Sequence, residues 1–109
     1  MFSRNPNWQI PEFEVLEFRP KGTRYCVAVF VINEGRRVRR QLTKMKDCLR
    51  YADIVIADGG STDGSLDLKL LKKDGVRTLL IKKGPGRLGA QMRMAFVYAL
   101  SQGYEGVIV

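Results

Sequence analysis

The sequence predicts an α/β fold, an open parallel β-sheet with helices on both faces in a three-layer α/β/α arrangement. Short apolar runs rich in β-branched residues alternate along the chain with segments of helical periodicity. The first of these runs is continuous, which is typical of a strand buried on both faces. Strands that alternate with helices in this way form right-handed βαβ units, and such units place their strands in a parallel sheet.

An N-terminal arm precedes the first strand and helix. Residues 1–24 are rich in proline and in aromatic residues, and we expect the aromatic side chains to pack on the domain. Within this arm, residues 13–18 suggest a short edge strand or an extended arm. Tyr25–Ile32 is a continuous apolar run and predicts the first strand. Glu34–Tyr51 predicts a helix, because apolar residues recur at helical spacing. These residues are Val38, Leu42, Met45 and Leu49.

Two more strands and a second helix follow. Asp53–Ala57 predicts a second buried strand, and Val76–Ile81 predicts a third. Between them, Thr62 or Asp63 is placed to cap a helix over residues 64–74. The inner face of this helix is expected to hold Leu66, Leu70 and Leu71.

The last part of the chain completes the alternation. Gly84–Gly89 predicts a glycine-rich turn, Gln91–Ser101 a third helix and Gly106–Val109 a fourth strand. The apolar face of the third helix is expected to hold Met92, Ala95, Phe96, Ala99 and Leu100. We interpret residues 25–109 as one structural unit. Because the sequence stops inside an apolar run, we expect the natural protein to continue beyond it.

Charge points to anionic partners. The chain has 109 residues, enough for one small domain, and a formal net charge of +8 from 19 basic and 11 acidic residues. Such a surface favours a phosphate ligand, a nucleic acid or an acidic membrane face. The basic residues fall in several clusters, most of which we interpret as solvated helix faces and loop ends.

Residue usage excludes some classes of function. The chain has no histidine, which excludes histidine-based catalysis and histidine ligation of metals. Cys26 and Cys48 lie among apolar residues and are expected to be buried, reduced thiols. No apolar run is long enough to span a bilayer, and residues 1–10 lack a signal-peptide core. We expect a cytoplasmic protein, with peripheral contact to a membrane left open.

Polar residues and glycines gather in three loops that follow predicted strands. The loops are residues 33–35, 58–64 and 84–89. In an open parallel sheet, ligands bind at the carboxyl ends of the strands, where the strand order reverses. Glycine lets a backbone approach a ligand closely, and a helix N-terminus attracts phosphate. These loops therefore form the predicted binding edge.

Asp58 follows the second strand directly and has two interpretations. Its carboxylate can accept hydrogen bonds from a ring N–H or a sugar hydroxyl, or it can close a turn on local amides. We expect Asp58 at the rim of a cleft near Glu34, with a carboxylate oxygen exposed. Glu34 itself either stabilises the start of the first helix or contacts a ribose. Ser61, Thr62 and Asp63 are interpreted as turn and capping residues, since no base is available to activate a nucleophile.

The turn Gly84–Gly89 is weak evidence on its own. It is not a phosphate-binding Walker A loop, because no Gly-Lys-Ser/Thr triplet ends it. It is not the dinucleotide fingerprint either. That motif follows the first strand, and the loop there holds only Gly35.

Together these loops resemble glycosyltransferase family 2, the inverting GT-A-type sugar transferases that include polyprenyl-phosphate sugar synthases. The family's first strand ends in a motif close to P-x-Y/F-N-E, of which Asn33-Glu34 is present while the proline and the aromatic are replaced. Its second strand ends in D-D-G-S-T-D-G-T/S, and residues 58–65 read DGGSTDGS. Gly86–Ala90 and Ala99–Tyr104 match two further stretches, so that the resemblance covers residues 25–109.

The resemblance implies a nucleotide-diphospho-sugar transferase fold, Rossmann-like, with the four strands in the spatial order three-two-one-four. It also implies that the first two loops hold the nucleotide of a UDP- or GDP-linked sugar. Asp58 would then reach the base, and Asn33 and Glu34 would lie along base and ribose. The nucleotide-binding residues expected on this ground are Val31, Asn33, Glu34, Asp58, Gly59, Gly60, Arg87 and Gly89.

The resemblance also implies chemistry that this chain is not expected to perform alone. The family holds a divalent metal, Mg²⁺ or Mn²⁺, on an acidic loop that would follow Val109, with a catalytic base and acceptor site further on. No catalytic residue or metal ligand is assigned here. The favoured hypothesis is the donor-binding part of a glycosyltransferase that acts on a lipid-phosphate or saccharide acceptor. The alternatives are an inactive, truncated nucleotide-binding module and, less favoured because no aromatic platform is present, a basic nucleic-acid-binding domain.

Overall fold

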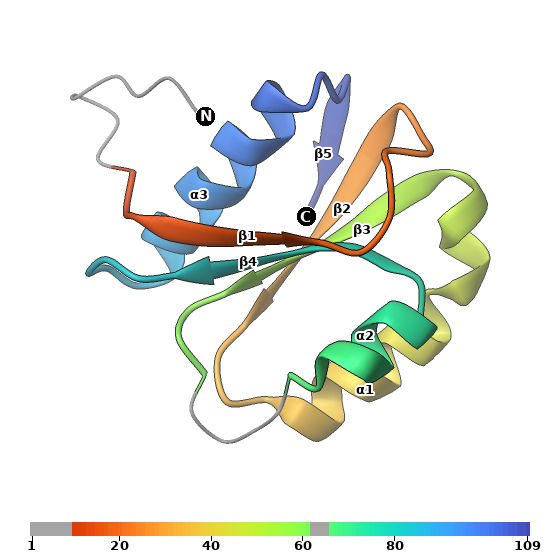
Figure 1. Cartoon of the computed structure of the whole chain (residues 1–109), viewed down its shortest axis with the longest axis horizontal. Helices are drawn as coiled ribbons and strands as arrows, with labels where there is room; N and C mark the ends of the chain where they lie inside the picture. The colour runs from red at the N-terminus through yellow and green to blue at the C-terminus, as the bar shows by residue number, and fades with distance from the viewer. Residues whose placement is uncertain (1–9, 62–65) are drawn as a thin grey trace.

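A computed structural model of the chain describes residues 10–61 and 66–109, apart from the side chains of residues 35 and 36. Its strands form one open sheet in the order β1-β4-β3-β2-β5 (Figure 1). The strands are β1 (Phe13–Glu17), β2 (Tyr25–Val31), β3 (Ala52–Asp58), β4 (Val76–Lys82) and β5 (Gly106–Ile108). β2, β3, β4 and β5 run parallel, and the order predicted for these four strands is confirmed.

β1 makes the sheet mixed, which corrects the expectation of a wholly parallel sheet. β1 pairs antiparallel with β4, with Phe13 opposite Lys82. The pairing continues past the strand, where the amide of Lys83 donates to the carbonyl of Glu12 at 2.7 Å. Of the two interpretations left open for this segment, the edge strand is confirmed. β1 covers the outer edge of β4, which would otherwise expose unpaired backbone groups.

Helices cover both faces of the sheet (Figure 1). α3 (Leu88–Ser101) packs on one face. The buried core there comprises Cys26, Ala28, Val55, Ala57, Leu80, Met94, Ala95, Tyr98, Ala99 and Tyr104. α1 (Gly35–Lys44) and α2 (Leu68–Lys73) pack on the other face. The buried core there comprises Val29, Val31, Val38, Leu42, Ile54, Ile56, Leu71, Val76 and Leu79. Successive residues of β3 enter opposite cores, as expected of a strand buried on both faces.

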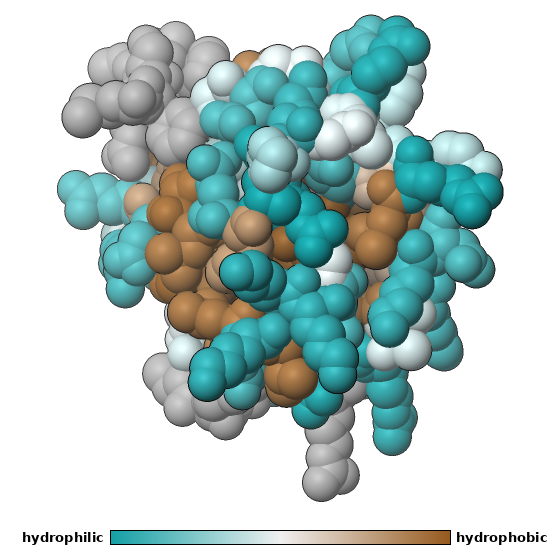
Figure 2. Space-filling view, turned by 45° about the vertical axis from the view of Figure 1, so that its right-hand side comes forward, coloured by the Kyte–Doolittle hydropathy of each residue, from teal (hydrophilic) through white to brown (hydrophobic). Residues whose placement is uncertain are grey.

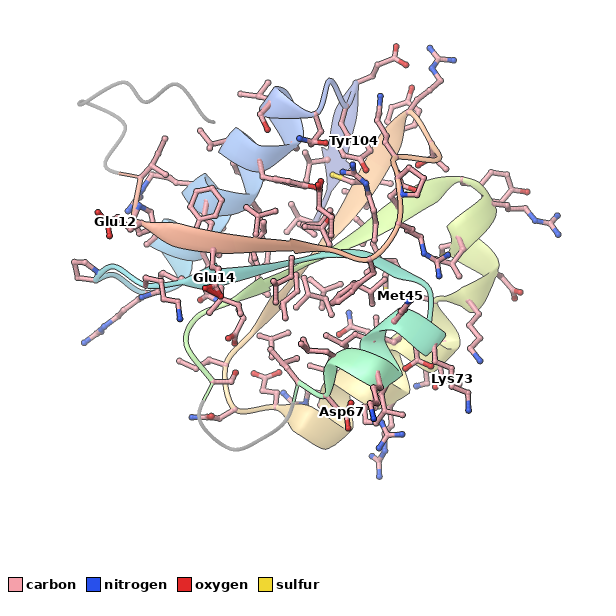
Figure 3. All side chains as sticks on the ribbon, viewed as in Figure 1. Glu12, Glu14, Met45, Asp67, Lys73 and Tyr104 are labelled. Carbon is pink, nitrogen blue, oxygen red and sulfur yellow. The ribbon has the colours of Figure 1, made fainter. Side chains whose placement is uncertain are left out.

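The first helix is shorter than the predicted Glu34–Tyr51. α1 ends at Lys44, and a 3-10 helix, η2 (Lys46–Arg50), follows it. Met45, at the junction, still packs against the core of this face (Figure 3). The apolar spacing therefore predicts which side faces inward but not where the α-helix ends, because α and 3-10 turns can present nearly the same residues to a core.

The second helix begins later than predicted. Its N-cap is Asp67, whose carboxylate accepts a hydrogen bond from the amide of Lys69 at 2.9 Å. Thr62 and Asp63, the predicted capping residues, lie outside the described residues. No helix in the described part of the chain is long and apolar enough to cross a bilayer.

The predicted inner face of the third helix is partly wrong. Ala95 and Ala99 are buried as expected, but Leu100 is 69% exposed. The large side chains that enter the core are Met94 and Tyr98, both fully buried. The sequence of α3, LGAQMRMAFVYALS, is apolar on nearly every side, so periodicity alone does not identify the side that meets the sheet.

A buried polar network lies at the amino ends of the parallel strands, next to the carboxyl end of antiparallel β1. Arg77 donates to the hydroxyl of Tyr98 at 2.7 Å and pairs with Glu17 at 3.2 Å. Nearby, the hydroxyl of Tyr104, labelled in Figure 3, donates to buried Asp53 at 2.6 Å. Burial raises the pKa of both tyrosine hydroxyls, so they remain protonated donors at neutral pH. The network joins β1, β3, β4 and α3 at one end of the sheet and leaves the carboxyl end for a ligand.

The two cysteines differ in their surroundings. Cys26 is buried at the start of β2, and burial raises the pKa of its thiol to about 11. Cys48 is exposed on η2, contrary to the expectation that both thiols are buried. Because the helix ends at Lys44 rather than continuing, the apolar neighbours of Cys48 in the sequence do not form a face that covers it.

Candidate functional site

A cleft of about 390 Å³ opens at the carboxyl ends of β2 and β3, beside the N-terminus of α3. Its lining residues come from the end of β2, the loops after β2 and β3, and the turn into α3. They are Phe30, Val31, Ile32, Glu34, Gly59, Gly86, Arg87, Leu88 and Gln91. The cleft thus forms where the sequence predicts the binding edge, since the carboxyl ends of parallel strands meet at one end of a sheet.

Gln91 forms the floor of the cleft. Its side-chain amide nitrogen donates to the carbonyl of Val31 at 3.1 Å and to the carbonyl of Ala57 at 3.0 Å. The side chain is 5% exposed and lies directly under Gly59, where an added Cβ would come within 3.0 Å of the amide group. One buried amide therefore ties α3 to the ends of both central strands, and a side chain larger than glycine at position 59 would press on it.

The loops after β2 and β3 are bonded to each other. The amide of Gly59 donates to the carbonyl of Val31 at 2.8 Å, and the amide of Asn33 donates to the hydroxyl of Ser61 at 2.9 Å. Asn33 has a φ of 49°, a left-handed conformation that asparagine adopts more readily than most residues. These bonds hold the two loops as one rim of the cleft.

Asp58 is not exposed at this rim, which corrects the expectation of an accessible carboxylate oxygen. It is 3% exposed, and its carboxylate accepts hydrogen bonds from the amide of Ser61 at 3.1 Å and from its hydroxyl at 2.6 Å. The same hydroxyl accepts the bond from Asn33. In this structure Asp58 therefore closes the turn after β3, the structural one of its two interpretations.

Glu34 and Arg87 bring opposite charges to the cleft. Glu34 is the N-cap residue of α1, but its side chain makes no capping hydrogen bond. Arg87 is the N-cap residue of α3, and no side-chain cap is formed there either. Both residues line the cleft. The start of α3 and the Arg87 guanidinium together make a local site for an anion, and the Glu34 carboxylate can accept hydrogen bonds from hydroxyl groups.

The turn before α3 depends on one glycine. Gly86 has a φ of +119°, and an added Cβ would lie 2.5 Å from the Cβ of Ala90. Only glycine fits this position, because it allows the backbone to approach the first turn of α3. A second hollow of about 650 Å³ lies across the same turn and is lined by Ile10, Pro11, Glu12, Gly84, Pro85, Gly86 and Arg93.

The structure assembles half of the predicted site residues at the cleft surface. Val31, Glu34, Gly59 and Arg87 line it. The predicted residues that do not line it are Asn33, Asp58, Gly60 and Gly89.

Sequence reasoning missed Gln91. The available signal was a glutamine in the first turn of a mostly apolar helix, just after a glycine-rich turn, because a polar group must find partners when it is buried. The spacing of the apolar residues predicts a helix here but gives no role to a polar residue such as Gln91.

The described residues of the cleft form no metal-binding group. Over residues 10–61 and 66–109, no three or more carboxylate or cysteine side chains lie close enough together to hold a metal ion. Glu34 is the one acidic residue of the described chain that lines the cleft, and Asp58 is engaged by Ser61. The described residues therefore do not by themselves form a ligand set for the divalent metal, which the family resemblance assigns to a loop after Val109.

Comparisons of the chain with models of protein families, with curated proteins and with solved structures found no match.

Proposed function

We propose that the chain binds the nucleotide part of a nucleotide-sugar, as the donor-binding portion of a family 2 glycosyltransferase. The observation that carries the proposal is the position of the cleft. The chain passes from β2 to β3 and β4 in one direction, and α3 then returns it to β5 on the other side of β2. The strand order reverses at β2, and the cleft lies at the carboxyl end of that strand.

The lining of the cleft suits the parts of a nucleoside diphosphate. Arg87 and the uncapped N-terminus of α3 favour the diphosphate. Glu34 is placed to accept hydrogen bonds from ribose hydroxyls. Ile32 and Leu88, which are 52% and 54% exposed, offer apolar surface to a base. Asp58 acts in this proposal through Ser61, as a residue that positions the loop after β3.

The motifs of the sequence supply the remaining support. Asn33-Glu34 and the segment 58–65 resemble the donor-binding loops of glycosyltransferase family 2, and the order of the four parallel strands is the one that this resemblance implies. On the same ground we propose a UDP- or GDP-linked donor, an acceptor that is a lipid phosphate or a saccharide, and a cytoplasmic site of action. No step of the transfer is assigned to this chain: its described residues form no metal-binding group, and Glu34 is the one described carboxylate that lines the cleft.

Isothermal titration calorimetry with UDP and GDP tests the proposal. The site is open to solvent and its cation is exposed, so we expect a dissociation constant of about 0.1–1 mM. Arg87→Ala should weaken binding about fivefold, the effect of one exposed charged contact. Arg50→Ala, which removes the same charge from η2, should leave binding unchanged. Equal weakening by both variants would show that only net charge matters. The absence of any heat of binding at a nucleotide concentration of about 10 mM, tenfold above the upper expected dissociation constant, would refute the proposal.

A further inference from the structure

The positive charge of the chain is concentrated on one helical layer. Arginine and lysine number five in α1, two in η2 and three in α2, out of 19 in the whole chain. The acidic residues within or flanking the described elements of this layer are Glu34, before α1, Asp47, within η2, and Asp67 and Asp74, which flank α2. α3, on the opposite face of the sheet, carries one basic residue, Arg93, and no acidic residue. One side of the molecule is therefore strongly cationic.

These charges are exposed and are not neutralised by ion pairs within the described chain. The exposed cations of the layer, called here the basic face, are Arg37, Arg39, Arg40, Lys44, Lys46, Arg50, Lys69, Lys72 and Lys73. The ion pairs formed by described side chains, Arg24–Glu105 and Arg77–Glu17, both lie elsewhere. Unneutralised like charges repel one another, and an external anion relieves this repulsion.

The basic face is broad. Arg39, Arg40 and Thr43 of α1 line a shallow hollow of about 300 Å³ together with Asp74, so the two helices lie side by side. Lys73 points away from the sheet (Figure 3). In Figure 2, which brings the right-hand side of Figure 1 forward, hydrophilic residues cover most of the right-hand surface. The cations thus spread over the outer surface of two helices rather than along a narrow groove.

We infer that the basic face docks on the anionic surface of a lipid bilayer. Clusters of four to eight basic residues on a helical surface bind anionic lipids, each charge contributing about fivefold in affinity. Two exposed apolar side chains border the face: Tyr51, 70% exposed after η2, and Leu68, 45% exposed at the start of α2. Tyrosine is enriched at the membrane–water interface, where its ring lies at the level of the lipid headgroups.

A bilayer fits this surface better than a nucleic acid does. Single strands bind in positively charged grooves with aromatic residues on which several bases stack, and Tyr51 is the one aromatic residue in or next to the three basic elements. The docking is independent of nucleotide binding, because no residue of the basic face lines the cleft.

Vesicle co-sedimentation of the purified chain tests this inference. The vesicles are phosphatidylcholine alone, or phosphatidylcholine with 30% phosphatidylserine, each at 50 and 500 mM NaCl. The test variant is Arg39→Gln/Arg40→Gln, and the matched control is Lys21→Gln/Lys83→Gln, which removes two charges outside the basic face. Lys69→Gln/Lys73→Gln on α2 provides a second test variant, and circular dichroism establishes that each variant is folded.

We expect binding to the anionic vesicles at low salt only. Each test variant should weaken it about 25-fold, since two charges are removed, and the control should weaken it less than threefold. Equal weakening by test and control variants would overturn the inference, as would binding to phosphatidylcholine alone. Tighter binding to a 20-base-pair DNA duplex than to the anionic vesicles at the same salt would overturn it in favour of a nucleic-acid partner.

Discussion

Removing the side-chain amide of Gln91 should lower the free energy of unfolding of the domain, because this group bonds the ends of two strands beneath the cleft. Gln91→Met keeps the length and the apolar stem of the side chain but removes the nitrogen that bonds the carbonyls of Val31 and Ala57. Both bonds are buried, and a buried acceptor that loses its partner costs about 1–3 kcal/mol. The carbonyl of Val31 keeps its bond from Gly59, and Ala57 lies within the β2–β3 ladder, so the cost falls inside this range rather than at twice its upper limit.

The expected decrease in the free energy of unfolding is about 2 kcal/mol, or roughly 8–16 °C in melting temperature for a domain of this size. Urea denaturation followed by circular dichroism measures it, with Gln41→Met on the exposed side of α1 as a control expected to stay within about 0.5 kcal/mol. A second variant, Gln91→Glu, places a carboxylate against two carbonyl oxygens. Its stability should therefore rise as the pH is lowered and the carboxylate becomes protonated.

Three results would refute this reasoning. Gln91→Met could be as stable as the Gln41→Met control, which would mean that water or a rearranged loop satisfies both carbonyls. Gln91→Glu could lack any pH dependence relative to the wild-type chain, which would mean that its side chain leaves the floor of the cleft. An increase in stability of Gln91→Met would mean that the buried amide is a cost retained for binding rather than a support of the fold.

Further predictions concern the core, alkaline pH and catalysis. Because Met94 is buried, Met94→Ala should lower the free energy of unfolding by about 2–5 kcal/mol in urea denaturation. Leu100 is exposed, so Leu100→Ala should change it by less than about 0.5 kcal/mol. Equal effects of the two substitutions would contradict the orientation of α3. Burial raises the pKa of Cys26 from 9.0 to about 11, and the unfolded chain loses this proton at lower pH. The free energy of unfolding should therefore fall between pH 9 and 11, by about 2–3 kcal/mol from this thiol, and Cys26→Ala should show a smaller decline if the account is correct. An assay with a radiolabelled donor, manganese and lipid-phosphate or saccharide acceptors should detect no sugar transfer, and turnover that disappears in Glu34→Gln would contradict this.

The arrangement of the parallel strands could be predicted because its signals are local. The central strands β2 and β3 are largely apolar runs, which is typical of strands buried on both faces. Gly75, at φ +90°, follows the C-cap residue of α2, where glycine commonly ends a helix. The antiparallel addition of β1 could not be predicted with the same certainty. Pairing at a sheet edge depends on a partner distant in sequence, here β4, and the arm carries no periodic pattern that identifies this partner.

The candidate site could be predicted as a place more easily than as a set of contacts. The polar loops follow the strands in the sequence, so their meeting at one edge follows from topology. Whether Asp58 points to solvent or to Ser61 depends on the local turn, which sequence spacing leaves open. The role of Gln91 depends on how α3 rotates over the sheet, and a helix that is apolar on nearly every side does not reveal that rotation.

The most direct test of nucleotide binding at the cleft is a two-dimensional ¹H–¹⁵N NMR titration of the chain with UDP and GDP up to 10 mM. Binding should shift the amide signals of Val31, Glu34, Gly59 and Arg87 in a saturable manner. The amides of Gly22 and Thr23, which bond Asp53 at the opposite end of the sheet, should not move. Saturable shifts confined to the cleft are the predicted result. Shifts confined to α1 and α2, or none with either nucleotide, would contradict the proposed site.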